Sequence, residues 1–227
     1  MFQQLKAWLA PVPPADDRRW VLLDVESSGL DTQRDRLLAI AAIAVHRADG
    51  DGPGAGAGDG PPRIALGDSF EVVLRQADGA LAPDKANILL HGIGVGAQRH
   101  GVAPAEGLTA FERYVGASPL IAFHAAFDRA MIDRACDAHL GRRLRNPWLD
   151  LEPVAAVLHP QVRARALDEW MGHFGISCAV RHQAAADTLA TAELLLKLWP
   201  AVRQQVKRPG FRALQELAAQ RRWMPAR

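Results

Sequence analysis

Four carboxylates and one histidine interrupt three apolar segments of this chain, which span residues 21–30, 121–128 and 181–187. They are Asp24, Glu26, Asp128, His182 and Asp187. An unpaired charge is costly to bury, so acids that lie inside apolar segments need a partner in the folded protein. Acids that converge in a core usually hold a divalent cation. The pattern therefore predicts a fold that brings the three distant segments to one place.

Residues 21–26 predict a β-strand, because the segment is short, rich in Val and Leu, and followed by the turn-forming residues Ser27-Ser28-Gly29. Side chains alternate along a strand, so Asp24 and Glu26 share one face. Two carboxylates at this spacing can both bind a single Mg²⁺ or Mn²⁺, since these ions prefer hard oxygen ligands. The alternative is an edge strand whose acidic face is solvated.

The second segment predicts a strand over 119–123 that leads into a helix over about 125–138. On that helix Asp128 falls in line with Ile132 and Ala135, at the spacing of a buried stripe. The alternative is that Asp128 caps the helix, although it comes late for that role. A buried acid on this stripe would face the core.

The third segment predicts a helix that carries Asp187 and runs to about Trp199, before Pro200. His182 comes five residues before Asp187, which on one helix would place the two side chains about 140° apart. They can meet at one site only if His182 lies in the loop ahead of the helix. A loop histidine beside a metal site suits a general base; the alternative is an ordinary surface histidine.

In this order and at these intervals, the motifs D-x-E, H-x-x-F-D and H-x4-D resemble the DEDDh class of 3′–5′ exonucleases, which includes the epsilon proofreading subunit of bacterial DNA polymerase III, ribonuclease T and oligoribonuclease. The resemblance covers about Trp20 to Trp199. Three softer features agree with it. They are His91-Gly-Ile93, Trp148-Leu-Asp150 and the helical segment 167–176.

The resemblance implies a reaction that uses two divalent metal ions, Mg²⁺ or Mn²⁺. It implies that the metal ligands are Asp24, Glu26, Asp128 and Asp187, and that His182 accepts the proton of the attacking water. In the family arrangement Asp24 would bridge both ions. Glu26 and Asp187 would complete the site of the water-activating metal, and Asp128 would support the second ion.

The resemblance also implies a site that holds the 3′-terminal nucleotide by hydrogen bonding and stacking. The candidate substrate-binding residues are Ser27, Ser28, Gly29, Leu30, His91, Ile93, His124 and Phe127. Two positions depart from the family pattern. The pair Ser27-Ser28 replaces Thr-Thr and keeps the hydroxyls and the turn preference. His124 replaces a common Asn, and it could contact the substrate or simply pack.

The predicted strands precede a series of helices that alternate with two further short strands. The strands are expected at about 20–26, 37–46, 64–76, 119–123 and 148–150. This order predicts an α/β protein with a mixed five-stranded sheet flanked by helices, the ribonuclease H-like fold that the resemblance also implies. Residues 48–62 are dominated by Gly, Asp and Pro, so we expect a flexible hairpin loop there rather than a phosphate-binding loop.

The chain has 227 residues, 49% of them hydrophobic, which is enough for one α/β core. We expect an N-terminal extension over 1–19, an exonuclease domain over 20–200 and a basic helical segment over 201–227. The last segment concentrates the basic charge of a chain whose net charge is only +2. The segment contains one acid, Glu216, and seven basic residues. They are Arg203, Lys207, Arg208, Arg212, Arg221, Arg222 and Arg227.

Two cysteines, Cys136 and Cys178, form neither a metal-type spacing nor a disulfide framework. No apolar run approaches the length of a membrane span, and the N-terminus lacks the features of a signal peptide. These features predict a cytoplasmic protein without a membrane partner.

Together these observations predict a metal-dependent 3′–5′ exonuclease of the proofreading or repair type. It would act on single-stranded or frayed 3′ ends, release nucleoside 5′-monophosphates and prefer DNA to RNA, with a possible DNA polymerase association. One alternative is an RNA-trimming enzyme of the oligoribonuclease or ribonuclease T kind. Another is a noncatalytic nucleic-acid-binding module of the same fold, although no acid of the set is missing.

Overall fold

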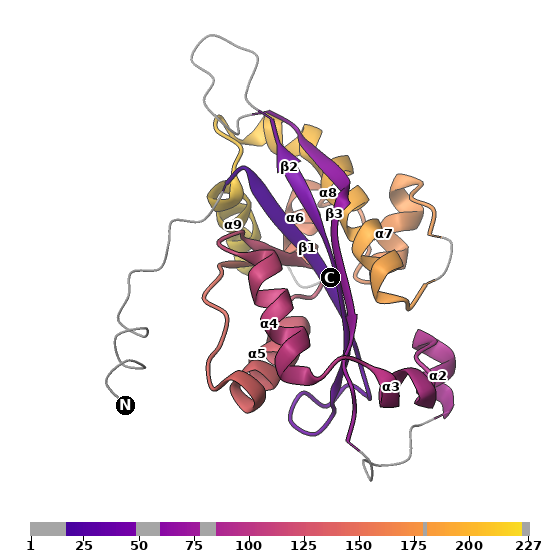
Figure 1. The fold of residues 1–227 in the computed structure, drawn as a ribbon. Coiled ribbons are helices and arrows are strands. Elements are labelled where there is room, and N and C mark those ends of the chain that lie inside the picture. The colour runs from indigo at the N-terminus through magenta and orange to yellow at the C-terminus, as the bar shows by residue number, and fades with distance from the viewer. Residues whose placement is uncertain (1–16, 49–59, 78–84, 179–180, 224–227) are drawn as a thin grey trace.

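The computed structural model describes residues 17–48, 60–77, 85–178 and 181–223. Their centre is a five-stranded sheet with the strand order β3-β2-β1-β4-β5 (Figure 1). The strands are β1 (Arg19–Ser27), β2 (Leu37–Arg47), β3 (Pro62–Val73), β4 (Leu120–Ala122) and β5 (Trp148–Asp150). The pairs β1–β2 and β2–β3 are antiparallel, whereas β1–β4 and β4–β5 are parallel. The predicted mixed sheet is confirmed.

Helices cover both faces of the sheet and account for two hydrophobic clusters. On one face lie α4 (Pro104–Val115) and α5 (Ala126–Leu140), and on the other lie α6 (Leu151–Leu158), α7 (Leu167–Phe174) and α8 (Ala184–Gln205) (Figure 1). The short helices α2 (Lys85–His91) and α3 (Val95–His100) lie together beside the lower end of the sheet in that view. In the part of the chain that the structure describes, no helix has the length and apolarity needed to cross a membrane.

Strand β1 is central, with β2 on one side and β4 on the other. Its side chains alternate as predicted, because Leu22 joins the cluster under α6 and α8 while Val21 and Leu23 join the cluster under α4 and α5. The alternative of a solvated edge strand is therefore wrong. Asp24 and Glu26 lie on the same face as Leu22, at the carboxyl end of a buried strand.

Helix α8 differs from the prediction at its end. It continues through Pro200 to Gln205, whereas the sequence predicted an end at about Trp199. Proline removes one N–H donor from a helix interior and normally kinks or ends the helix. Here Trp199 and Val202, on either side of the proline, are buried in the core, and this burial offsets the loss.

Strands β2 and β3 form the predicted hairpin. Arg47 pairs with Pro62, and the N–H of Gly60 donates to the carbonyl of Ala48 at 2.9 Å. Most of the Gly-rich loop predicted over 48–62 lies outside the described residues, as do residues 1–16 of the predicted N-terminal extension.

The C-terminal segment packs on the domain through α9 (Phe211–Gln220), which lies in the helical segment expected there and buries Phe211, Leu214 and Leu217. Arg47 holds the chain just before this helix, because its Nη2 donates to the carbonyl of Pro209 at 2.6 Å. The same guanidinium lies 4.9 Å from the ring of Trp20. These contacts place α9 against the sheet rather than free in solvent.

Candidate active site

The carboxyl ends of the parallel strands and the first turns of two helices meet at one end of the sheet. Asp24 and Glu26 come from the end of β1, Asp128 from the first turn of α5 and Asp187 from the first turn of α8. The side chains of Asp128 and Asp187 are buried. In sheets with parallel strands, ligands commonly bind beyond the carboxyl ends of the strands, so this is the expected position for a site.

Asp128 links helix α5 to the central strand. Its Oδ1 accepts a hydrogen bond from the backbone N–H of Val25 at 3.1 Å, and the residue is 3% exposed. The N-cap position of the helix is Ala125, so the alternative that Asp128 is the N-cap is wrong. The predicted inward orientation of this acid is confirmed.

Negative charge is unfavourable at the site where the acids meet. Burial raises the pKa of Asp24 well above its ordinary value, and the nearby Asp128 and Glu26 carboxylates raise it further. Burial also raises the pKa of Glu26 to about 8, with a further contribution from Asp187. The pKa of Asp128 is raised by burial to about 7. A hard divalent cation would relieve this repulsion, so the donor set suits such an ion.

His182 lies in the loop ahead of α8, whose N-cap is Gln183. This is the position it needs to share a site with Asp187, and its N–H donates to Oδ2 of Asp187 at 3.2 Å. Its φ angle is 61°, in the left-handed region that side chains other than glycine rarely adopt. Its ring is exposed. The loop therefore presents the imidazole to solvent beside the acids.

Arg181 belongs to the same site, and the sequence gave no role for it. Its Nη1 forms an ion pair and hydrogen bond with Oδ1 of Asp187. In the described ranges of the chain, no three acid, histidine or cysteine side chains form a ready-made metal-ligand set. Asp187 is instead paired with the guanidinium of Arg181. The position of Arg181 directly before His182 was the one signal that could have suggested its role.

His124, in the loop between β4 and α5, also has a positive φ, of 60°. Its N–H donates to Oδ1 of Asp150 at 2.9 Å, and its Nε2 lies 3.0 Å from the carbonyl oxygen of Arg165. The ring also packs against Phe123, with 4.6 Å between centroids. Asp150 in turn accepts from the N–H of Glu152 at the start of α6. Asp150 therefore fixes this loop, a role that the sequence did not predict.

The turn after β1 is held by its own side chains. The hydroxyl of Ser27 donates to the carbonyl of Gly29 at 2.6 Å, and that of Ser28 donates to Oδ1 of Asp35 at 2.9 Å. A Cβ on Gly29 would collide with the Asp35 carboxylate, which explains the glycine. Leu30 is 88% exposed at the tip of this turn. The hydroxyls therefore shape the turn, and Leu30 offers an apolar surface.

Helix α2 lies beside both the β1 turn and the His182 loop. The amide Nδ2 of Asn87 donates to the carbonyl of Ser27 at 2.9 Å. On the other side, a Cβ on Gly92 would lie 3.8 Å from Nε2 of Gln183. The segment that contains His91 and Ile93 is thus brought to the site.

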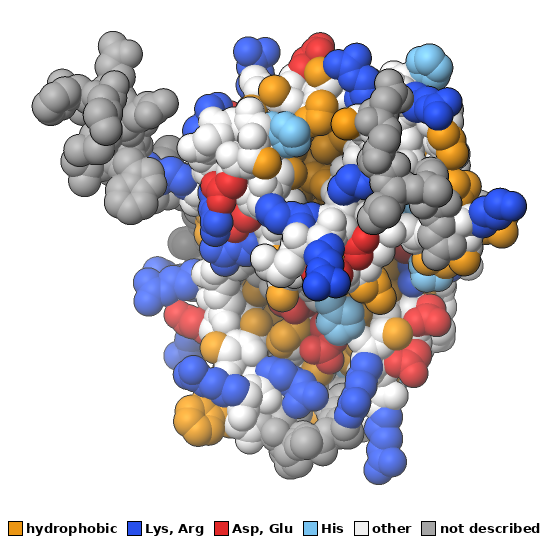
Figure 2. Space-filling model, turned by 90° about the horizontal axis from the view of Figure 1, so that it is seen from below, with side chains coloured by type: hydrophobic (Ala, Val, Ile, Leu, Met, Phe, Trp, Pro, Cys, Tyr) orange, Lys and Arg blue, Asp and Glu red, His pale blue; other side chains and the backbone are white. Residues whose placement is uncertain are grey.

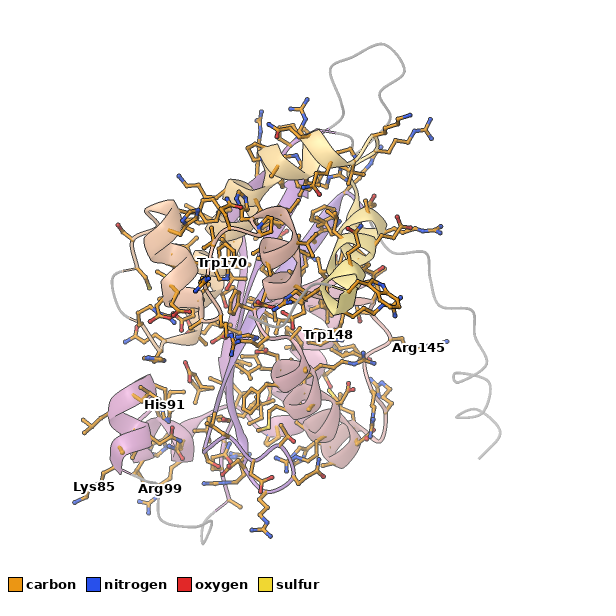
Figure 3. The ribbon with its side chains drawn as sticks, turned by 180° about the vertical axis from the view of Figure 1, so that it is seen from behind. Lys85, His91, Arg99, Arg145, Trp148 and Trp170 are labelled. Carbon is orange, nitrogen blue, oxygen red and sulfur yellow. The ribbon has the colours of Figure 1, made fainter. Side chains whose placement is uncertain are left out.

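His91 points inward, where α2 meets α3, whereas Lys85 and Arg99 point away from the pair of helices (Figure 3). The imidazole Nδ1 accepts the N–H of Ile93 at 2.9 Å, and the residue is 4% exposed. Burial lowers the pKa of His91. Its Nε2 makes no hydrogen bond to any described residue. Phe127, in the first turn of α5, is partly buried against the neighbouring cluster.

A family model described as exonuclease matches residues 21–195. Curated relatives include a PolC-type DNA polymerase III of Clostridium perfringens, 27% identical over 183 residues, and a DNA polymerase III subunit epsilon-like protein of Rhodobacter capsulatus, 28% identical over 193 residues. The matches cover 79% and 84% of this chain but only 11% and 25% of those proteins. The chain thus corresponds to a small part of each.

Solved structures show the same fold. Exonuclease I of E. coli, in complex with a dT13 oligonucleotide, superposes with a TM-score of 0.67 at 16% identity, covering 82% of this chain and 42% of that one. Exonuclease I of Methylocaldum szegediense superposes with a TM-score of 0.63 at 19% identity, covering 80% and 40%. At these identities the likeness establishes the ribonuclease H-like fold.

Proposed function

The chain belongs to the exonuclease family, and we propose that it is a metal-dependent enzyme that removes nucleotides from the 3′ end of single-stranded or frayed DNA. The products would be nucleoside 5′-monophosphates. The observation that carries the proposal is the convergence of Asp24, Glu26, Asp128 and Asp187. Burial raises the pKa values of Asp24, Glu26 and Asp128, and neighbouring acids raise them further. Such a cluster is unfavourable unless it binds cations.

We infer that these four acids would hold divalent ions, Mg²⁺ or Mn²⁺. When bound, the ions would neutralise the charge of the phosphate and lower the pKa of a water molecule. The hydrogen bond from the Val25 N–H holds the Asp128 carboxylate in one rotamer before a metal ion binds. The N–H of Ala184 at the start of α8 lowers the pKa of Glu26 against the larger effect of burial, which helps keep this ligand charged.

His182 is proposed as the group that accepts the proton of the attacking water. The residue is exposed and its backbone N–H donates to Asp187, so its imidazole would be placed to reach a water molecule in the site. Histidine is the side chain that most often serves as a general base in enzymes. On the other side of the site, Leu30 and the segment from His91 to Ile93 would hold the terminal sugar and base.

DNA is the proposed substrate because the relatives carry names of DNA polymerase III and the structural neighbour holds a dT13 strand. The same names suggest a polymerase as a partner. An RNA-trimming activity of the oligoribonuclease or ribonuclease T kind remains the second candidate, since the candidate catalytic residues would treat DNA and RNA alike. A noncatalytic binding module is the third.

The proposal is tested with matched DNA and RNA oligonucleotides that carry a label at the 5′ end. With Mg²⁺ or Mn²⁺, we expect a ladder of DNA products that shortens from the 3′ end, while a chelator abolishes it. A preparation of the Asp24→Asn variant serves as the control for contaminating nucleases. Faster hydrolysis of RNA would favour the second candidate, and binding without metal-dependent hydrolysis would favour the third.

A further inference from the structure

A groove of about 700 Å³ lies between the lower ends of β2 and β3 and the helices α4 and α5. None of the candidate catalytic residues lines it. In the view from below, Lys and Arg side chains stand around hollows whose floor is hydrophobic (Figure 2). The groove has the same two components, basic side chains and an apolar floor.

Its basic side chains are Arg36, Arg75, Arg134 and His139, and its lining contains no carboxylate among the described residues. The side chains of Arg75 and Arg134 make no hydrogen bond or ion pair within the part of the chain that the structure describes. Among the described residues, the guanidinium of Arg36 donates only to the neutral amide Oε1 of Gln76, at 3.2 Å. Three guanidinium groups therefore face one groove without an anionic partner in the described ranges of the chain.

The floor of the groove is apolar. Leu37, Leu74 and Met131 are buried side chains of the core that reach its lining, together with Ala135. An apolar floor below a basic rim suits a ligand that carries both phosphates and flat or apolar groups. A nucleic-acid strand has both, since sugars and bases alternate with phosphates.

Two lining residues, Arg36 and Met131, lie next to residues of the candidate active site. The near end of the groove is Arg36, whose N–H donates to Oγ of Ser28 at 2.9 Å, in the turn just after Glu26. On the facing side, Met131 lies one helical turn beyond Asp128. From Met131 the groove follows α5 to His139, and eight residues of helix extend about 12 Å. That length matches a short stretch of a strand that leaves the site.

We propose that this groove binds the phosphodiester backbone of the substrate strand on the 5′ side of the terminal nucleotide. Guanidinium groups bind phosphate oxygens in pairs of parallel hydrogen bonds, and contacts to the backbone position a strand without reading its sequence. The proposal rests on the proposed function, because it assigns the groove to the same substrate. The groove proposal differs from the proposed function because binding of a strand in the groove needs neither metal nor hydrolysis.

The test measures binding of a fluorescent single-stranded DNA by anisotropy, in the presence of a chelator and over a series of salt concentrations. The variant is Arg75→Gln with Arg134→Gln, which removes two unpaired charges. We expect affinity to fall about tenfold, and the slope of log K against log salt to become shallower by about 1.4, since each phosphate contact on a single strand contributes about 0.7. Hydrolysis of a small nucleotide ester, which reaches only the catalytic acids, should be unchanged.

The matched control is Arg63→Gln with Arg113→Gln, which removes the same charge from exposed positions outside the groove. It should bind like the parent. Equal affinity and slope for the groove variant and the parent would overturn the proposal. So would a mononucleotide that competes as well as the strand, because the groove would then be a free-nucleotide site. A parent that binds the strand through the groove but hydrolyses nothing would contradict the proposed function alone.

Discussion

The guanidinium of Arg181 is paired with the carboxylate of Asp187. Arg181, which directly precedes the candidate base His182, therefore binds one of the four candidate metal ligands. The pair is largely sheltered, with the side chains 28% and 10% exposed. Arg181 also lowers the pKa of Asp24, against the larger effect of burial. In this arrangement the arginine supplies part of the positive charge that the acid cluster needs, and a cation must compete with it for Asp187.

Arg181→Gln should therefore tighten the binding of Mn²⁺ measured by titration calorimetry. Loss of a competing ion pair worth about 1 kcal/mol corresponds to a dissociation constant about fivefold lower. The metal-free variant should also melt at a lower temperature, because the acids lose a neutralising neighbour.

The control for this variant is Arg129→Gln, which breaks the pair between the exposed Arg129 and the largely buried Asp133 on α5. It should leave the affinity for metal unchanged. If Arg181→Gln bound Mn²⁺ no more tightly than this control, competition for Asp187 would be the wrong account of the pair.

Asp24→Asn should abolish metal-dependent hydrolysis and stabilise the metal-free protein. The residue is buried among Asp128, Glu26 and Asp187, so a neutral amide removes repulsion. A gain of about 1 kcal/mol would raise Tm by about 2–4 °C in a chain of this size. Scanning fluorimetry should show this rise, together with loss of the shift that metal induces in the parent. Near-normal turnover by the purified variant would refute the metal-site assignment.

The metal-free protein should lose stability as pH rises from the ordinary carboxyl range towards 8. The pKa of Glu26 is raised to about 8 and that of Asp128 to about 7. The folded state therefore binds more protons than the unfolded state over this interval, and unfolding free energy falls with pH until both groups are charged. Denaturant titrations across this range measure the effect.

The same shifts require metal binding to release protons. Calorimetry in buffers of different ionisation enthalpy should detect this release near pH 7, and affinity for metal should increase with pH up to about 8. Affinity and stability that both stay flat with pH would show that the acids are charged throughout.

The sequence was sufficient to predict the strand that carries Asp24 and Glu26, because alternation along β1 depends only on neighbouring residues. The inward orientation of Asp128 followed from helical spacing in the same way. The Arg181–Asp187 pair was not predicted, because it forms across a loop that contains the left-handed His182, and only the place of Arg181 directly before His182 hinted at it. The passage of α8 through Pro200 depends on tertiary burial.

His182→Asn should lower kcat by about 10²–10⁴-fold, the usual contribution of a general base. Asparagine tolerates the positive φ at this position, so the loop and the affinity for metal should persist. His124→Asn controls for the effect of the substitution on a left-handed backbone, because His124 has almost the same φ. A His182→Asn variant that lost metal binding but kept the acid limb of the pH–rate profile would make His182 a ligand rather than a base.

The C-terminal basic segment offers a second surface for substrate phosphates, at a different edge of the sheet. Helix α9 lies against β5, where Nε2 of Gln215 donates to the carbonyl of Trp148 at 3.2 Å. Arg221 and Arg222 follow it in the short helix η1 (Arg221–Trp223), and Arg227 lies outside the described residues. The groove proposed above lies instead at the β2–β3 side.

Removing charge at Arg221, Arg222 and Arg227 should raise KM for long single strands and weaken its dependence on salt. It should leave KM for strands that fill only the groove beside α5 unchanged, because the two surfaces lie at different edges. Hydrolysis of a small nucleotide ester should also be unaffected. If the triple variant and the parent showed equal KM and equal salt dependence on long strands, these arginines would be a solvated face or a surface for a protein partner. The groove would then be the main phosphate-binding surface beyond the catalytic acids.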